Sequence, residues 1–251
     1  MRIVRVMVAV GSFSLLTAIA SAAQSGQQTN VIQPLPQDLE IQLALSALPA
    51  HLRDGATVYI LNPQKGFEVG RKGTNGFHAF VVRTGPGAFR ASWPFTQYRD
   101  DILAPIAFDS AGVNAHMQMF FDVAAMQAEG MAPAELKRMI NKRYETGYYR
   151  APERAGVSYM LSPLFRVYEN PAESDTVTTM NYPHYMFYAP YVSNQDIGGE
   201  LMSPHPFIID PGPHGFIIQG VGEAEKAAIN KAYEVMLARL CQLRKVYCLP
   251  E

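Results

Sequence analysis

The chain has 251 residues, of which 48% are hydrophobic and 11% aromatic, and its formal net charge is −1. This hydrophobic content supplies a real core and excludes a mostly disordered chain. No basic run or basic face stands out, so composition argues against a nucleic-acid binder. The length fits one large domain.

The first element is a short apolar segment with two arginines before it. Arg2 and Arg5 precede the uncharged run 6–19, and the small residues Ala20-Ser21-Ala22 follow. This layout is typical of a cleavable secretory signal peptide. The run is shorter than the ~20 residues that span a bilayer. We therefore expect a signal peptide over 1–22 with cleavage after Ala22, a periplasmic or secreted protein, and no membrane span after cleavage.

The next part of the chain predicts a flexible start followed by strands. Residues 23–37 are rich in Gln, Ser, Asn and Pro, and predict a flexible mature N-terminus. A short helix is expected over 38–48. Three segments rich in β-formers then predict an antiparallel meander of strands at 56–61, 67–71 and 77–83. Residues 84–105 are expected to form loops.

Helices alternate with short strands in the rest of the chain. A largely buried helix is expected from Ser110 to Glu129, and Pro133 opens a second helix that runs to Thr146. Short strands are expected at 157–161, 165–168, 185–188, 207–209 and 216–218, and prolines between them predict edges or short pieces. A helix over 223–246 closes the chain. This order predicts an α+β fold with helices packed on an antiparallel sheet, in a single domain over 38–251.

Two short motifs carry a resemblance. The segment Gly73-Thr-Asn-Gly-Phe77 is followed by Val81-Val82-Arg83, and Pro183-His-Tyr-Met-Phe187 lies downstream. Together they resemble a group of uncharacterised exported bacterial proteins with no known activity. In that group a cysteine often stands in the strand after the glycine-rich turn, and another follows a Pro-Ile pair. Ala79 and Ala107 hold those places here, so the resemblance implies that a core disulfide of that kind is absent.

The glycine-rich stretch around this motif allows two interpretations. Gly70-Arg-Lys-Gly73 and Thr74-Asn-Gly76 offer backbone N–H groups and two cations that could nest an anion. A hairpin turn whose glycines supply positive φ explains the same residues and is the favoured interpretation.

The two cysteines of the chain invite a disulfide, because exported proteins meet an oxidising environment. Cys241 and Cys248 lie seven residues apart at the end of the last expected helix. A continuous helix would hold them ~10 Å apart along its axis, which is too far for a bond. A bridge therefore requires the helix to end near Tyr247. The sequence leaves the bridge and two free thiols as equal alternatives.

The leading functional hypothesis is non-catalytic binding of a small molecule or a partner in an aromatic-lined cleft. Aromatic side chains with a polar group suit sugars and small apolar ligands. The expected cleft residues are Tyr182, His184, Tyr185, Tyr188 and Tyr191. No catalytic residue and no cofactor is predicted under this hypothesis.

The alternative is a metal-dependent hydrolase. His205, Asp210 and His214 flank one short expected strand, and His184 lies beside another. Zinc takes imidazole and carboxylate ligands and activates water at an open position. In such a site Asp210 would be a ligand or the general base. Ordinary hydrogen-bonding histidines in proline-rich loops explain the same pattern.

A further alternative is periplasmic copper handling. His116 precedes Met117 and Met119, and His184 precedes Met186. Thioether and imidazole groups together suit Cu(I). Buried methionine is more often core packing, so packing remains the other interpretation.

Overall fold

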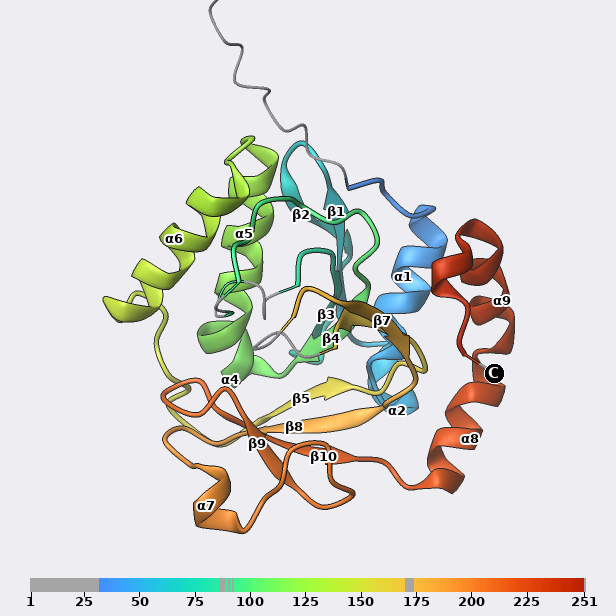
Figure 1. The fold of residues 1–251 in the computed structure, drawn as a ribbon. Coiled ribbons are helices and arrows are strands. Elements are labelled where there is room, and N and C mark those ends of the chain that lie inside the picture. The colour runs from blue at the N-terminus through green and yellow to red at the C-terminus, as the bar shows by residue number, and fades with distance from the viewer. Residues whose placement is uncertain (1–31, 86–88, 90, 92, 170–173, 251) are drawn as a thin grey trace, which may run out of the picture.

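The computed structural model describes residues 32–85, 89, 91, 93–169 and 174–250, and the expected signal peptide lies outside them. Helices cover both faces of a sheet in a single α+β unit (Figure 1). The helices are α1 (Gln37–Ser46), α2 (Ala50–Arg53), α4 (Ser110–Gly112), α5 (Gln118–Ala128), α6 (Pro133–Glu145), α7 (Asn194–Ile197), α8 (Glu223–Ala232) and α9 (Glu234–Leu243). A π-helical turn, η1 (Val113–Met117), joins α4 to α5, and a 3-10 turn, η2 (Lys245–Tyr247), follows α9. Among the described residues, no helix has the length and apolar character needed to cross a membrane.

The sheet is mixed but mostly antiparallel, and its eight strands run in the order β2-β1-β3-β4-β5-β8-β10-β9. A separate two-stranded sheet contains β6 and β7. The strands are β1 (Thr57–Asn62), β2 (Gly66–Arg71), β3 (His78–Val82), β4 (Ala104–Phe108), β5 (Val157–Met160), β6 (Phe165–Tyr168), β7 (Val177–Met180), β8 (His184–Tyr188), β9 (Phe207–Ile209) and β10 (Phe216–Gly220). The predicted α+β class is confirmed.

The expected meander of three antiparallel strands is wrong in its last pairing. β1 pairs with β2 antiparallel, but β1 and β3 run parallel. The glycine-rich turn explains this, because the backbone N–H groups of Thr74 and Asn75 both donate to the carbonyl oxygen of Gly55, at 2.7 and 3.0 Å. The Gly73 N–H donates to the Thr57 hydroxyl at 3.0 Å. The turn therefore carries the chain across the start of β1, and these three amides are used within the fold rather than for an anion.

The strand β4 lies in the middle of the sheet, although a loop was expected up to Pro105 and no element from there to Ser110. It contains Pro105, which lacks an N–H group for a strand ladder. The ladder between β4 and β5 includes only Ala107 and Phe108, so Pro105 lies where β4 has β3 as its ladder partner. The short ladder to β5 thus accommodates a proline within an interior strand. β8 and β10 are also interior strands, and the prolines near them lie outside their bounds.

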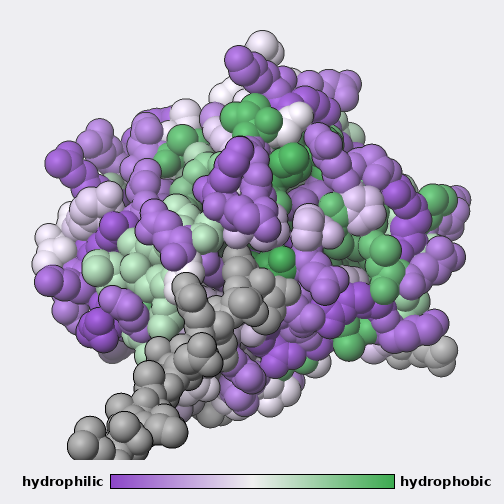
Figure 2. Space-filling model, turned by 90° about the horizontal axis from the view of Figure 1, so that it is seen from above, coloured by the Kyte–Doolittle hydropathy of each residue, from purple (hydrophilic) through white to green (hydrophobic). Residues whose placement is uncertain are grey.

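Alternating residues of the central strands feed two different cores, as the period of a strand requires. Ala79 and Val81 of β3 pack with α1 and α9, whereas Phe80 and Val82 face the opposite core. Helices α1 and α9 lie on one side of the sheet, and α5 and α6 lie on the other (Figure 1). Ala79 and Ala107 are direct cross-strand partners on the α1 side. The polar exterior is seen in Figure 2, where hydrophilic residues cover most of the face shown.

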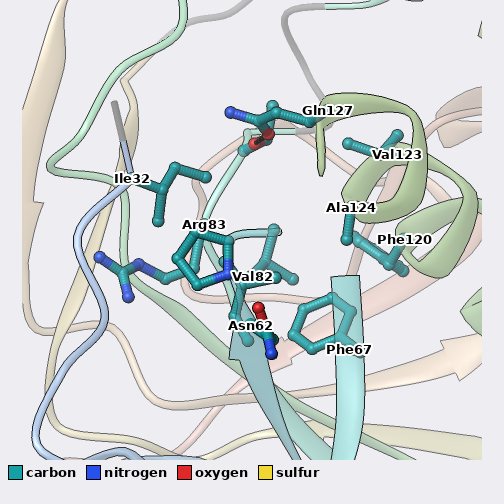
Figure 3. Close-up of a pocket in the computed structure, with 12 residues that line it drawn as sticks. Ile32, Asn62, Phe67, Val82, Arg83, Phe120, Val123, Ala124 and Gln127 are labelled. Atoms are coloured by element: carbon teal, nitrogen blue, oxygen red, sulfur yellow. Dashed lines mark hydrogen bonds between the residues drawn. The ribbon is translucent and has the colours of Figure 1, made fainter. Parts of the chain in front are cut away.

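Ile32 and Gln33, the first residues that the structure describes, pack against the rest of the domain. Ile32 is buried against Leu61 and Ala124, and the carbonyl oxygen of Gln33 accepts a 2.9 Å hydrogen bond from the buried Arg83. Figure 3 shows Ile32 on one side of a small hollow, with Ala124 and Val123 of α5 on the other. The hollow is about 10 Å³, so it has room for about one water molecule and not for a larger ligand.

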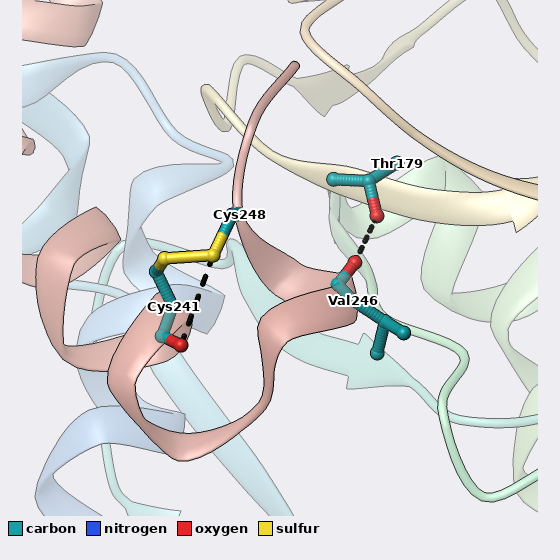
Figure 4. Close-up of a disulfide and its surroundings, with 4 residues drawn as sticks. All are labelled: Thr179, Cys241, Val246 and Cys248. Atoms are coloured by element: carbon teal, nitrogen blue, oxygen red, sulfur yellow. Dashed lines mark hydrogen bonds between the residues drawn. A yellow bond between two sulfur atoms is a disulfide. The ribbon is translucent and has the colours of Figure 1, made fainter. Parts of the chain in front are cut away.

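The expected final helix is divided in two at Tyr233, and it ends at Leu243 rather than near Val246. After α9 the 3-10 turn folds the chain back, which brings the Cα atoms of Cys241 and Cys248 to 4.4 Å, and the two form a disulfide. Figure 4 shows this bridge beside Val246, whose carbonyl oxygen accepts a hydrogen bond from Thr179 of β7. The bridge therefore closes a short loop that fixes the C-terminal segment to the small sheet.

Removing the disulfide should weaken the fold modestly. Because the loop is short, the double substitution C241S/C248S should lower the free energy of unfolding by about 2 kcal/mol. Urea unfolding measures this loss, and a reductant should reproduce it in the wild type but not in the variant. Two free thiols in the denatured, oxidised wild type would contradict the bridge.

Candidate functional site

A cavity of about 330 Å³ lies between the sheet and α5. Its walls come from strands β3 to β6 and β8, from the helical run that includes η1 and α5, from α6, and from the segment 209–216. The alternation of β4 places Ala104, Ile106 and Phe108 on this side, while Ala107 faces α1. Most of the lining is apolar, and includes Val82, Phe120, Met160, Val167, Met186 and Ile209. Small-molecule sites are commonly of this size and character.

Polar rings gather at one part of this cavity. The His116 and His214 rings lie 5.6 Å apart, centroid to centroid, and the Tyr144 ring is 5.1 Å from His214. His116 also packs on Phe216, with 4.3 Å between ring centroids. Both imidazoles are buried, with 6% and 4% of their surface exposed. We call His116, His214 and Tyr144 the imidazole cluster.

A π-helical turn presents His116 to the cavity. Asp109 caps the helix start by accepting the N–H of Gly112 at 2.9 Å, and its other carboxylate oxygen accepts the N–H of Val157 at 3.2 Å. The Tyr188 hydroxyl donates to the same carboxylate at 3.0 Å, and the Tyr188 ring lies 4.8 Å from His116. π-Helical turns within α-helices are frequent at functional sites because they reorient a side chain. Asp109 and Tyr188 thus position the helix start that carries His116.

A strained turn presents His214. Asp210 has φ +50 and lies at the exposed rim of the cavity, and Gly212 with φ +127 follows it. Left-handed backbone at a non-glycine residue is uncommon and often marks a functional segment. The His214 Nε2 atom lies 3.1 Å from the carbonyl oxygen of Tyr149. Because a carbonyl oxygen only accepts, Nε2 carries a proton and the ring orientation is fixed.

The structure does not gather the five residues of the expected aromatic cleft, and none of them lines the cavity. Tyr188 packs on His116 without lining the cavity, and Tyr191 is 76% exposed. The Tyr185 hydroxyl donates to Glu225 at 2.9 Å, which places it on the α8 side. Tyr182 and His184 pack on one another with 5.1 Å between ring centroids. Burial lowers the pKa of His184 to about 4, so this ring is neutral at neutral pH.

The four expected metal ligands are also dispersed. His205 lies in an exposed turn, where its N–H donates to the Ser203 hydroxyl at 3.3 Å. His214 is buried at the cavity, Asp210 lies at its rim, and His184 lies on β8 outside it. Over the described part of the chain, no group of three or more His, Cys, Asp or Glu side chains is arranged to hold a metal ion. The zinc hypothesis receives no geometric support.

The sequence indicates part of this site, since His214 and Asp210 are candidate ligands and His116 lies beside two methionines. The sequence does not connect them, because His116 reaches the cavity from η1 and His214 from a turn almost a hundred residues later. The continuous apolar run 104–108 was the signal available for the wall, but Pro105 within it argues against an interior strand.

Comparison with known proteins finds no matching family model, no matching curated protein and no matching solved structure.

Proposed function

We propose that this protein is an exported binder of a small, mostly apolar molecule, which it encloses in the cavity of about 330 Å³. The supporting observation is the combination of a large apolar lining with the imidazole cluster in one part of it. Such a site recognises shape through the apolar wall and orients the ligand through a few polar groups. The proposed site differs from the expected cleft at Tyr182–Tyr191, although Tyr182 and Tyr188 belong to the core that borders the cavity.

The cavity volume sets the size of the ligand. A cavity of about 150 Å³ holds one benzene ring in a designed case, so a volume of 330 Å³ suits a molecule of about two fused rings or a chain of similar bulk. A single polar group on that molecule would lie against the imidazole cluster, which is the polar part of the lining. 2-Naphthol has both properties and serves as the probe.

The test is calorimetric titration of the mature protein with 2-naphthol. The full-length gene is expressed in a bacterium with a periplasm. Mass spectrometry of the intact purified protein shows whether cleavage occurs after Ala22. We expect binding with a Kd on the order of 10 µM. Phenol should bind more weakly because it leaves space unfilled, and the four-ring pyrene should not enter.

Two variants block the cavity from different sides. Ala104→Leu extends from β4 and Val167→Phe extends from β6, and both residues line the cavity. Either variant should weaken 2-naphthol binding by about tenfold or more, because the added side chain occupies the ligand volume. Val69→Leu is the matched control, since Val69 is 51% exposed on β2. Equal binding by the control and both folded blocking variants would overturn the proposal.

Copper handling remains the second candidate, because Met119, Met160 and Met186 line the same cavity. Thioether sulfur favours Cu(I) over harder metal ions. In a Cu(I) competition assay, binding tighter than about micromolar that is lost in Met186→Leu would support this candidate. Binding no tighter than micromolar would remove it and leave the organic ligand in place.

A further inference from the structure

A second hollow lies on the other side of the helical run that carries His116. Its volume is about 320 Å³. One wall comes from residues 113–121 and the other from residues 148–150, which follow α6. The first cavity uses His116, Met119 and Phe120 of the same run, so the two hollows use different faces of it. We call this second hollow the surface groove.

The surface groove is far more polar than the cavity. The amides of Asn114 and Gln118 are exposed along one wall, and the Gln118 side chain is oriented by donating to Asp122 at 2.7 Å. The opposite wall ends in the exposed Arg150. Amides exchange hydrogen bonds with hydroxyl groups in both directions. The walls therefore suit a ligand with several hydroxyl groups.

The groove also carries one unbalanced positive charge. Arg143 is nearby but forms an ion pair with Asp122, which neutralises it. Over the described residues, Arg150 has no ion-pair partner. A guanidinium in this situation favours a carboxylate, which it binds through two parallel hydrogen bonds.

Aromatic side chains supply the remaining surface. Tyr148 is 55% exposed, and its ring is held by the edge of Tyr149 at 5.3 Å and by the Arg143 guanidinium at 4.6 Å. Phe121 and the buried Met117 complete the apolar part of the groove. A tyrosine ring fixed in this way offers apolar contact beside a polar hydroxyl, which suits the C–H face of a sugar ring.

We propose that the surface groove binds a sugar acid. The carboxylate of the sugar acid accepts hydrogen bonds from Arg150, and its hydroxyl groups form hydrogen bonds with Asn114 and Gln118. The C–H face of the sugar ring packs on Tyr148. This site is separate from the first cavity, and it does not rest on the function proposed above.

The test is an NMR titration of the folded mature protein with glucuronate, glucose and acetate. Glucuronate should shift the backbone signals of Asn114, Gln118, Tyr148 and Arg150, with a Kd on the order of 1 mM. Glucose, which lacks the carboxylate, and acetate, which lacks the ring, should each bind about tenfold more weakly. Ala104→Leu should leave the glucuronate titration unchanged, which separates this site from the cavity.

Charge removal decides the role of Arg150. Arg150→Gln should weaken glucuronate binding by about tenfold, because it removes the charge-assisted hydrogen bonds to the carboxylate. Arg138→Gln is the matched control on the exposed face of α6, outside the groove. Absence of shifts with glucuronate, equal affinity for acetate, or the same affinity in both variants would overturn the proposal.

Discussion

Asp101→Asn should lower the free energy of unfolding by about 3 kcal/mol, because it breaks a buried ion pair and leaves a cation without its partner. Asp101 is 5% exposed and Arg166 of β6 is 8% exposed. Two nitrogens of Arg166 reach the same carboxylate oxygen of Asp101, at 2.6 and 3.0 Å. Arg99 adds a paired contact at 2.8 and 2.9 Å. The carboxylate thus joins β6 to the segment that leads into β4.

The neighbouring residue provides a matched control. Asp100 pairs with Arg244 at 3.1 Å, but both side chains are more than a third exposed. Solvent screens such a pair, so Asp100→Asn should cost less than about 1 kcal/mol. Equal losses in the two variants, measured by urea unfolding at pH 7, would show that Asp101 does not hold a buried charge.

The same carboxylate predicts a loss of stability in acid. Burial by itself raises the pKa of Asp101, but hydrogen bonds and charges from Arg99 and Arg166 outweigh it and bring the pKa below its ordinary value. A lowered folded-state pKa stabilises the protein above the unfolded value of about 3.9, and this contribution is lost as the pH falls below it. Below about pH 4 the wild type should therefore lose stability more steeply than Asp101→Asn. Parallel curves would contradict this assignment.

Gly73→Ala should cost about 3 kcal/mol, at the upper end of the range for overpacked sites. A Cβ atom at this position would lie 2.2 Å from the carbonyl oxygen of Gly55 and 2.4 Å from the backbone nitrogen of Thr57. These are backbone atoms of the segment that opens β1, so they cannot rotate away as a side chain would. The crossover that makes β3 parallel to β1 would have to move.

Gly76 lies in the same turn and serves as the control. Its substitution tests the cost of positive φ without a steric clash. It has φ +76, and a Cβ there would meet nothing within 4 Å. Gly76→Ala should therefore cost only the left-handed backbone penalty of about 1 kcal/mol. Thermal and urea unfolding of both variants give the comparison. A loss in Gly73→Ala no larger than in Gly76→Ala would mean that the backbone approach is not required.

Local pattern was enough to predict several elements. Residues 165–168 and 207–209 form strands with the expected bounds, and the helix opened by Pro133 ends one residue before the expected Thr146. These elements were predictable because proline, glycine and apolar periodicity act within a few residues of one another. The α+β class followed from their order.

Tertiary context decided the rest. β3 runs parallel to β1 because the backbone at Gly73 approaches Gly55 and Thr57 closely. β4 can lie inside the sheet because its ladder to β5 does not reach Pro105. The strand β7 formed at Val177–Met180, where no strand was expected, because β6 supplied its partner. Such pairings join distant segments and leave no periodic signal in either one.

The same division applies to the candidate site. The sequence by itself determined an apolar content high enough for a core, the secretory layout of residues 1–22 as an expectation, and the identity of His116, Asp210 and His214 as residues able to bind ligands. Only the tertiary structure decided that His116 and His214 meet at one cavity while His184 and His205 lie apart from it. The physical reason is that a cavity is formed by residues brought together from η1, α6 and the turn before β10. No local pattern encodes the distance between them.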